Sequence, residues 1–240
     1  MAGRLEWLTA RVVEVRKETS AARTIVLEVP AWPGHRAGQH VDLKLTAEDG
    51  YSAQRSYSLA APPAGSIVEI TVQRVADGEV SPFLVDDLLI GDELELRGPI
   101  GGWFAWNPIW TEPVLLVAGG SGVVPLMAMV RERARVRSRV PFRLIYSVRS
   151  PDDVFYAGEL QGRVDGVDVT IVHTRTAHSG RPAGRLTAAE LAASGWPADF
   201  GPRIFVCGPT GFVENIAATL LAQGHSPASV RTERFGPTGG

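Results

Sequence analysis

LLVAGGSGVVPLMAM, residues Leu115–Met129, is an apolar run that passes through a glycine turn into a helical pattern. An apolar strand followed directly by a helix is typical of an α/β sheet. Glycines at such a junction let backbone N–H groups approach a phosphate near the helix N-terminus. Gly120 and Gly122 match the dinucleotide fingerprint, but Pro125 stands where its third glycine belongs, so a tight turn and a nucleotide site both stay open.

The sequence around this stretch repeats the same alternation of strand and helix. Four apolar stretches are candidates for strands, at Val114–Ala118, Arg143–Val148, Val167–Val172 and Arg203–Cys207. Helical patterns lie between or after them, at Pro125–Val136 and Gly211–Ala222. Buried strands that alternate with helices predict a parallel sheet covered on both faces. Cys207 lies at the carboxyl end of one such strand, where open α/β sheets bind ligands, although a lone buried cysteine more often serves as a small core residue.

The first half of the chain has a different pattern, which predicts an antiparallel sheet or barrel. Short β-branched runs are broken by turn residues at Ala10–Val15, Arg23–Val29, His40–Leu45, Ser56–Leu59, Ile67–Arg74 and Asp92–Arg97. A helix is expected over Ser81–Leu88, with Ser81 as N-cap and Pro82 in the first turn. Segment Trp103–Pro113 separates the halves, so we expect domains at residues 1–108 and 109–240.

Composition excludes several classes of protein. The chain has 240 residues, 24 Lys plus Arg, 26 Asp plus Glu and a net charge of −2, which gives no electrostatic footprint for nucleic acid or an anionic membrane. One cysteine excludes a disulfide framework within the chain, a Cys-rich zinc site and a cysteine-ligated iron–sulfur cluster. The histidines are scattered without metal-ligand spacing, so we assign them no chemistry and expect no metal. The first residues lack the pattern of a secretory signal, so we expect a cytoplasmic protein.

Two stretches of the first half suggest anion binding. In Gln54–Leu59, QRSYSL, a strand would place Arg55 and Tyr57 on one face and Ser58 on the other, so that a cation and a ring serve one ligand. A solvated arginine beside a half-buried tyrosine explains the same pattern. Gly78–Ser81 enters the expected helix with free N–H groups, which makes it a second potential phosphate cradle.

Together these motifs resemble the ferredoxin–NADP reductase superfamily, the flavin and nicotinamide reductases of plants and bacteria. The chain is most similar to the stand-alone reductase modules of oxygenase systems. The resemblance covers roughly Leu8 to Phe235 and rests on ordered motifs, namely Arg55-Ser-Tyr57-Ser58, Gly78-x-x-Ser81, Gly98-Pro-x-Gly101, Gly119-Gly-x-Gly122-x-x-Pro125, Cys207-Gly-Pro209 and Glu233-x-Phe235.

The resemblance implies a two-domain β plus α/β fold, with an N-terminal antiparallel Greek-key flavin-binding β-barrel and a C-terminal Rossmann-like parallel α/β domain that binds NAD(P)H. It implies catalytic roles beside the reacting rings for Ser58, Cys207, Glu233 and Phe235, with Phe235 covering the flavin. Implied flavin contacts are Arg55, Ser56, Tyr57, Ser58, Val72, Gln73, Arg74, Gly78, Glu79, Val80 and Ser81. Implied nicotinamide-nucleotide contacts are Gly120, Ser121, Gly122, Pro125, Arg149, Arg175, Cys207, Gly208 and Pro209.

The function that the resemblance implies is transfer of electrons from NAD(P)H through FAD to a separate ferredoxin or oxygenase component. FAD is favoured over FMN because the phosphate cradle suits a pyrophosphate. Arg149 and Arg175 follow two strands and favour NADPH over NADH, because an arginine fork matches a 2′-phosphate. An NAD(P)H:flavin reductase that uses free flavin, and a non-catalytic flavin- or nucleotide-binding module, remain as alternatives.

Overall fold

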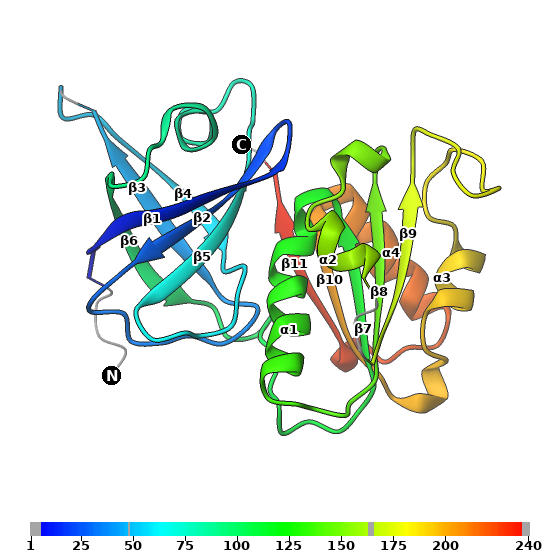
Figure 1. Cartoon of the computed structure of the whole chain (residues 1–240). Helices are drawn as coiled ribbons and strands as arrows, with labels where there is room; N and C mark the ends of the chain where they lie inside the picture. Colours follow the sequence, from blue (N-terminus) through cyan, green and yellow to red (C-terminus); the bar gives the residue numbers. More distant parts are fainter. Residues whose placement is uncertain (1–5, 48, 163–165, 237–240) are drawn as a thin grey trace.

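The computed structural model describes residues 6–47, 49–162 and 166–236, which form an antiparallel and a parallel sheet side by side (Figure 1). The antiparallel sheet has the strand order β4-β3-β6-β1-β2-β5. Its strands are β1 (Leu8–Thr19), β2 (Ala22–Glu28), β3 (His40–Thr46), β4 (Ser52–Ser58), β5 (Ile67–Gln73) and β6 (Glu93–Ile100). Because β6 lies between β1 and β3, the order is not a simple meander but has the crossed connection of a Greek key.

The antiparallel sheet curls until its two edge strands meet. Leu59, which follows β4, forms a bridge with Ile70 of β5, and Ala60 N–H donates to the Glu69 carbonyl at 2.8 Å. The interior is filled by apolar side chains such as Val41 and Leu43, which are fully buried. This confirms the predicted N-terminal antiparallel barrel.

The second sheet is wholly parallel, in the order β11-β10-β7-β8-β9, as the solid apolar strands predict. Its strands are β7 (Val114–Gly119), β8 (Phe142–Val148), β9 (Val167–His173), β10 (Arg203–Pro209) and β11 (Val230–Phe235). The helices are α1 (Val123–Arg135), α2 (Ala157–Gln161), α3 (Ala188–Ser194) and α4 (Thr210–Ala222). Single 3₁₀ turns are η2 (Gly120–Gly122), η3 (Pro151–Asp153), η4 (Ala198–Phe200) and η5 (Pro227–Ser229).

Three features differ from the sequence-based expectations. The expected helix Ser81–Leu88 is a π-helical turn, η1 (Phe83–Asp87), and Ser81 does not cap it, because its Oγ accepts a hydrogen bond from Val75 N–H at 3.0 Å. Strand β11 was not predicted, since its polar sequence VRTERF lacks the apolar run of the other parallel strands. The short helices α2 and α3 were also missed, as neither is long enough to give a clear period.

Helix α1 lies between the two sheets (Figure 1). Most of its residues are buried, because the parallel sheet covers one side and the barrel the other. Small barrel residues allow this close approach: Ala37 and Ala60 belong to the same apolar cluster as α1. A Cβ on Gly38 would lie 2.1 Å from the Phe104 carbonyl oxygen and 2.6 Å from Met129 Cε. Helix α1 therefore packs against both the parallel sheet and the barrel.

Within the part of the chain that the structure describes, no helix is both long and apolar enough to cross a membrane.

Candidate functional site

Four residues converge where the edge of the barrel meets the carboxyl ends of β10 and β11. Ser58 at the end of β4 pairs with His40 at the start of β3. The His40 Nδ1 lies 3.6 Å from Glu233 Oε1 of β11, across the interface. Glu233 in turn pairs with Cys207 of β10. The structure thus brings together Ser58, Cys207 and Glu233, which the sequence analysis placed together, and adds His40.

Polar atoms at this junction lack partners. Ser58 Oγ and Glu233 Oε2 are buried and make no hydrogen bond within the described residues. Buried polar atoms are rarely left unpaired, because each lost hydrogen bond costs about 1–3 kcal/mol. Burial, and secondarily the charge of Glu233, raises the pKa of the Cys207 thiol well above its ordinary value, so the thiol is neutral. The junction therefore presents buried polar atoms that are available for hydrogen bonds to a ligand.

The two strand-to-helix glycine turns pack directly against each other beside this junction. A Cβ on Gly122 would lie 2.1 Å from the Cys207 carbonyl oxygen, and one on Gly119 would lie 2.7 Å from the Phe212 ring. Gly120 has φ +54°, which L side chains rarely adopt. Ser121 is half-buried between these glycines, and Pro125 occupies the first turn of α1. The glycines thus let η2 and α1 approach the end of β10, leaving backbone N–H groups near the junction.

The residues of β4 alternate between the two faces of the strand, as expected, since Arg55 pairs with Leu43 and Tyr57 with Val41, whereas Ser58 pairs with His40. Arg55 is exposed and pairs with Glu79 at 3.1 Å, and Tyr51 donates to the same carboxylate at 2.8 Å. Tyr57 instead packs against the barrel core, where burial raises its pKa. Ser56 donates to Asp42 at 2.6 Å. Arg55 and Tyr57 therefore share one face of β4, with Arg55 exposed and Tyr57 half-buried, while Ser58 lies on the other face with His40.

In the predicted phosphate-binding segment Gly78–Ser81, one backbone N–H group is already hydrogen-bonded, and three are not. Gly78 N–H donates to Val75 O at 3.0 Å, and the Ser81 hydroxyl accepts from Val75. The backbone N–H groups of Glu79, Val80 and Ser81 meet no acceptor within the described residues. The remaining residues of this predicted group lie as follows: Val72 and Val80 have side chains in the barrel core, Gln73 is exposed, and Arg74 pairs with Asp86 at 2.6 Å.

Arg149 and Arg175 lie next to each other beyond the carboxyl ends of β8 and β9. The backbone N–H of Arg175 donates to the Arg149 carbonyl at 2.9 Å. Both side chains are exposed, and in the described part of the chain neither meets an acidic partner. Two free cations at adjacent strand ends can bind an anionic group.

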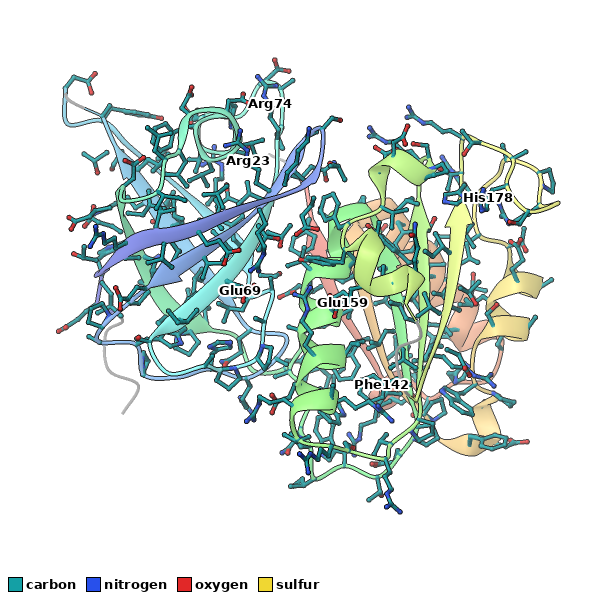
Figure 2. All side chains as sticks on the ribbon, in the orientation of Figure 1. Arg23, Glu69, Arg74, Phe142, Glu159 and His178 are labelled. Carbon is teal, nitrogen blue, oxygen red and sulfur yellow. The ribbon has the colours of Figure 1, made fainter. Side chains whose placement is uncertain are left out.

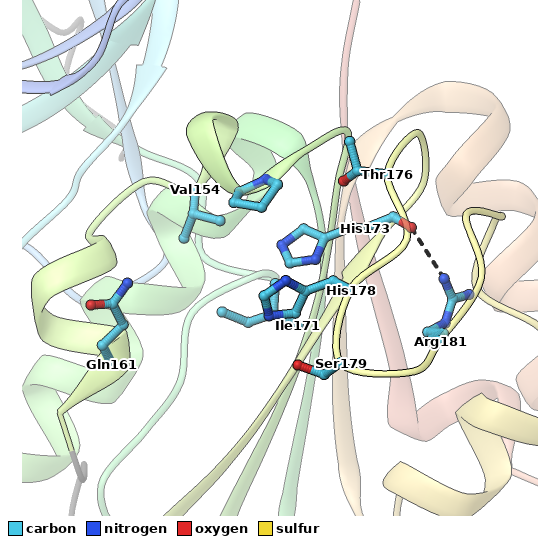
Figure 3. A pocket seen from close by; sticks show the side chains of 9 residues that line it. Val154, Gln161, Ile171, His173, Thr176, His178, Ser179 and Arg181 are labelled. Atoms are coloured by element: carbon cyan, nitrogen blue, oxygen red, sulfur yellow. Dashed lines mark hydrogen bonds between the residues drawn. The ribbon is translucent and has the colours of Figure 1, made fainter.

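A pocket of about 350 Å³ lies at the carboxyl end of β9 (Figure 3). Its lining includes Pro151 and Thr176, close in sequence to Arg149 and Arg175. The rings of His173 and His178 meet edge to face at 4.8 Å. Burial lowers the pKa of His173, which favours its neutral form. The further lining residues are Val154, Gln161, Ile171, Ser179 and Arg181.

Among the described residues that line this pocket, Arg181 is the one arginine, and its guanidinium already has partners. It pairs with Glu190 and donates to several carbonyls, including that of His173 at 3.1 Å (Figure 3). The pairing lowers the pKa of Glu190 to about 2. Arg181 therefore holds the loop after β9 in shape.

The last predicted residues lie at the end of β11. Phe235 is half-buried, pairs with Pro209 of β10 and packs against the apolar cluster around α1. Gly208 is buried, with φ +157°, and a Cβ there would lie 2.9 Å from the Phe212 ring. Phe235 therefore adjoins the Cys207–Gly208–Pro209 turn.

Family models match both halves of the chain. The model described as the oxidoreductase FAD-binding domain matches residues 9–104, and the oxidoreductase NAD-binding domain matches residues 116–218. The chain belongs to the ferredoxin–NADP reductase superfamily. The barrel is its FAD-binding domain and the parallel sheet its NAD-binding domain.

Several named proteins are similar over almost the whole chain. It is 33% identical, over 95% of its own length, to the glycine betaine monooxygenase reductase subunit of Chromohalobacter salexigens, of which it spans 64%. It is 32% identical, over 95% of its length, to the ferredoxin reductase component of 3-ketosteroid-9-alpha-monooxygenase from Mycolicibacterium smegmatis, of which it spans 65%. The chain thus spans less than two thirds of the length of these relatives.

Solved structures show the same arrangement. The FAD/NAD-binding domain of nitric oxide dioxygenase from Vibrio cholerae superposes with a TM-score of 0.87 at 26% identity, covering 96% of this chain and 99% of that one. A cytochrome P450 reductase from Amycolatopsis gives a TM-score of 0.85 at 28% identity, covering 99% of this chain and 72% of that one. The two-domain fold is therefore established.

The residues at the junction fit a flavin and a nicotinamide. The unpaired Ser58 Oγ belongs to the FAD-binding domain, and the unpaired Glu233 Oε2 lies on β11, beside the NAD-binding domain. Sequence analysis missed three histidines here: His40 lies at the junction, and His173 and His178 line the pocket. His40 gains its neighbour Glu233 only where β3 and β11 meet, whereas the rings of His173 and His178 meet through the loop after β9.

Proposed function

We propose that this protein is an NAD(P)H-dependent flavoprotein reductase that passes electrons to a separate acceptor. The convergence of Ser58, His40, Glu233 and Cys207 between an FAD-binding and an NAD-binding domain carries the proposal. Two of these residues hold buried polar atoms without partners among the described residues. A junction between the two domains suits the flavin and nicotinamide rings, which must come into contact for hydride transfer.

Bound FAD supplies the ability to accept a hydride, two electrons with one proton, from NAD(P)H and to release the electrons singly. The chain supplies binding, orientation and exclusion of water. Ser58 and Cys207 lie on opposite sides of the junction and would flank the reacting atoms. Glu233, whose Oε1 lies 3.6 Å from His40 Nδ1, would orient them or relay a proton through Oε2. Phe235 would cover the flavin until the nicotinamide replaces it.

The pyrophosphate of FAD would bind where Arg55 and the Glu79–Ser81 backbone lie. Arg55 would exchange Glu79 for phosphate, because its fork matches a phosphate in two hydrogen bonds. The unpaired N–H groups of Glu79, Val80 and Ser81 would complete the site. Tyr57 would support the flavin from the barrel side, with Ser56, Val72, Gln73, Arg74 and Gly78 as neighbours of the bound cofactor.

We propose NADPH as the preferred donor. Arg149 and Arg175 are adjacent at strand ends and have no acidic partner among the described residues, and the pocket lined by Pro151 and Thr176, close to them in sequence, suits the adenosine end of the nucleotide. The turn formed by Gly120, Ser121, Gly122 and Pro125 would hold the pyrophosphate, and Gly208 and Pro209 would support the nicotinamide.

The acceptor we propose is a separate ferredoxin or oxygenase component. Relatives are named as reductase subunits or components of monooxygenases. Cys207 is the one cysteine of this sequence, so it holds no cysteine-ligated iron–sulfur cluster. The domain division at residues 108 and 109 and the cytoplasmic location stay predictions.

The experiment is an anaerobic titration of the FAD-loaded protein with NADPH and, separately, NADH. Loss of the oxidised flavin absorbance, followed by electron transfer to an added ferredoxin, is the expected result. Flavin that binds tightly yet is reduced by neither nucleotide would favour a non-catalytic module. Flavin that dissociates on gel filtration but is consumed in turnover would favour the NAD(P)H:flavin reductase.

A further inference from the structure

A chain of buried hydroxyls crosses the domain interface, away from the Ser58–Cys207 junction. Thr24 Oγ1 of β2 lies 2.7 Å from Thr71 Oγ1 of β5, and Thr71 Oγ1 lies 2.6 Å from the Tyr156 hydroxyl. Tyr156 precedes α2 in the NAD-binding domain, so the last of these hydrogen bonds joins the two domains. The exposed fractions are 1% for Thr24 and 5% for both Thr71 and Tyr156. We call these residues, with Glu18, the interface clamp.

Glu18 of β1 closes the clamp from the barrel side. One carboxylate oxygen accepts from Thr24 Oγ1 at 2.6 Å, and the other accepts from the backbone N–H of Tyr156 at 3.0 Å. Tyr156 has φ +58°, a left-handed conformation that is costly for a tyrosine. Such a conformation persists only where surrounding contacts fix it. The barrel thus holds Tyr156 at both its backbone and its hydroxyl.

Arg131 of α1 adds a second connection. Its guanidinium lies 4.4 Å from the Tyr156 ring centroid and pairs with Glu159 of α2, which faces the barrel in Figure 2. Its Nη1 also donates to the Ala60 carbonyl at 2.7 Å. Ala60 follows Ser58 by two residues, so this hydrogen bond reaches the segment that carries Ser58.

The clamp has no part in the chemistry proposed above. Tyr156 lines neither the junction nor the pocket of Figure 3. A buried polar network is costly unless every member is paired, and when it is paired it favours one arrangement over others. Apolar contacts have no strong directional preference, so on their own they would allow small shifts of one domain against the other. The hydrogen bonds of the hydroxyl chain form in only one relative position of the domains.

We propose that Tyr156 is a positioning residue, which through Thr71 and Glu18 fixes the NAD-binding domain against the barrel and so sets the distance between the reacting groups. This proposal rests on the proposed function. Hydride transfer requires near contact, and a displacement of about 1 Å can cost about a hundredfold in rate.

The test compares Tyr156→Phe with Tyr146→Phe. Tyr146 is also buried, but its hydroxyl accepts from Phe155 N–H at 3.3 Å, within its own domain. In FAD-loaded protein, the limiting rate of flavin reduction by NADPH should fall about tenfold in Tyr156→Phe, with the nucleotide Kd unchanged. Tyr146→Phe should keep the wild-type rate. Equal rates in all three proteins would overturn the proposal.

A second readout needs neither flavin nor turnover. Glu28→Cys on β2 and Glu214→Cys on α4 place spin labels on exposed sites of the two domains, while Cys207 is fully buried. The distance distribution in flavin-free protein should broaden in Tyr156→Phe and stay narrow in Tyr146→Phe. An unchanged distribution in both variants contradicts the clamp even if the flavin is reduced. Failure of reduction in wild-type protein instead contradicts the proposed function.

Thr71→Val provides an independent variant if Tyr156→Phe folds poorly. It removes the same interdomain hydrogen bond from the barrel side and should broaden the same distribution. The double variant should be no slower than the slower single variant, because both changes break the same interdomain hydrogen bond between Thr71 and Tyr156. Additive losses of rate would show that Tyr156 does not act through Thr71.

Discussion

At the residue scale, the junction depends on side chains whose chemistry is set by burial. The family resemblance implies that Cys207, Ser58 and Glu233 lie together, and strand pairing brings Glu233 beside Cys207 and Ser58 beside His40, whose ring faces Glu233. His40 was not foreseen, because its neighbour Glu233 is 193 positions away and pairs with it only after both domains fold. The sequence therefore predicts the members of the site better than their contacts.

Cys207→Ala tests the neutral thiol at the junction. We expect FAD binding to be preserved and flavin reduction by NADPH to slow about tenfold or more, because a group that orients the nicotinamide is lost. Stopped-flow absorbance under anaerobic conditions measures the rate. If the Cys207→Ala variant reduces flavin at the wild-type rate, Cys207 is an ordinary core residue with no part in the reaction.

Arg149→Ala and Arg175→Ala test nucleotide selection. Each should weaken NADPH binding about tenfold while leaving NADH nearly unchanged, because the guanidinium contacts only the 2′-phosphate. Steady-state KM for both nucleotides measures this. Arg139→Ala, at another exposed arginine, is the matched control. Equal losses for NADPH and NADH would refute the assignment.

At the element scale, apolar periodicity predicted the long strands and helices well. The strands from β7 to β10 and the helices α1 and α4 lie close to their predicted bounds. Strand β11 escaped prediction because it is an edge strand with polar residues on it, and its partner β10 specifies its place. The π-helical turn η1 is likewise set by packing of Leu84 and Val85 into the barrel.

Gly122→Ala tests the contact between η2 and β10. Its Cβ would meet the Cys207 backbone at 2.1 Å, so the turn must move and we expect a loss of about 2–4 kcal/mol in unfolding free energy. Gly211→Ala, at the other strand-to-helix junction, has nothing within 4 Å and should be neutral. Denaturant unfolding measures both. Equal stability of the two variants would contradict the packing described.

At the scale of the whole molecule, the two domains are joined through helix α1. The sequence predicted two domains from the change of pattern, but it carried no sign that α1 packs on both, since a helix buried on two sides has no polar face to orient it. The apolar cluster around α1 includes Ala22, Ala37 and Ala60 of the barrel. The domains are therefore expected to unfold together.

Gly38→Ala tests this interface. Gly38 (φ +99°) and Gly34 (φ +85°) both have a left-handed backbone, so alanine is strained at either position. Only at Gly38 would the added Cβ also clash with Phe104 and Met129. We expect Gly38→Ala to lower the melting temperature clearly more than Gly34→Ala. Calorimetry measures the difference, and equal shifts would mean that the interface is loosely packed.

The most direct test of the central claim, that one junction between the domains binds the flavin, is a crystal structure of the FAD-loaded protein. The account predicts that Ser58 Oγ and Glu233 Oε2 both gain hydrogen bonds at the bound flavin or its ordered water, and that Arg55 moves from Glu79 to phosphate. A flavin bound elsewhere, with the Arg55–Glu79 pair intact and both atoms still unpaired, would contradict it.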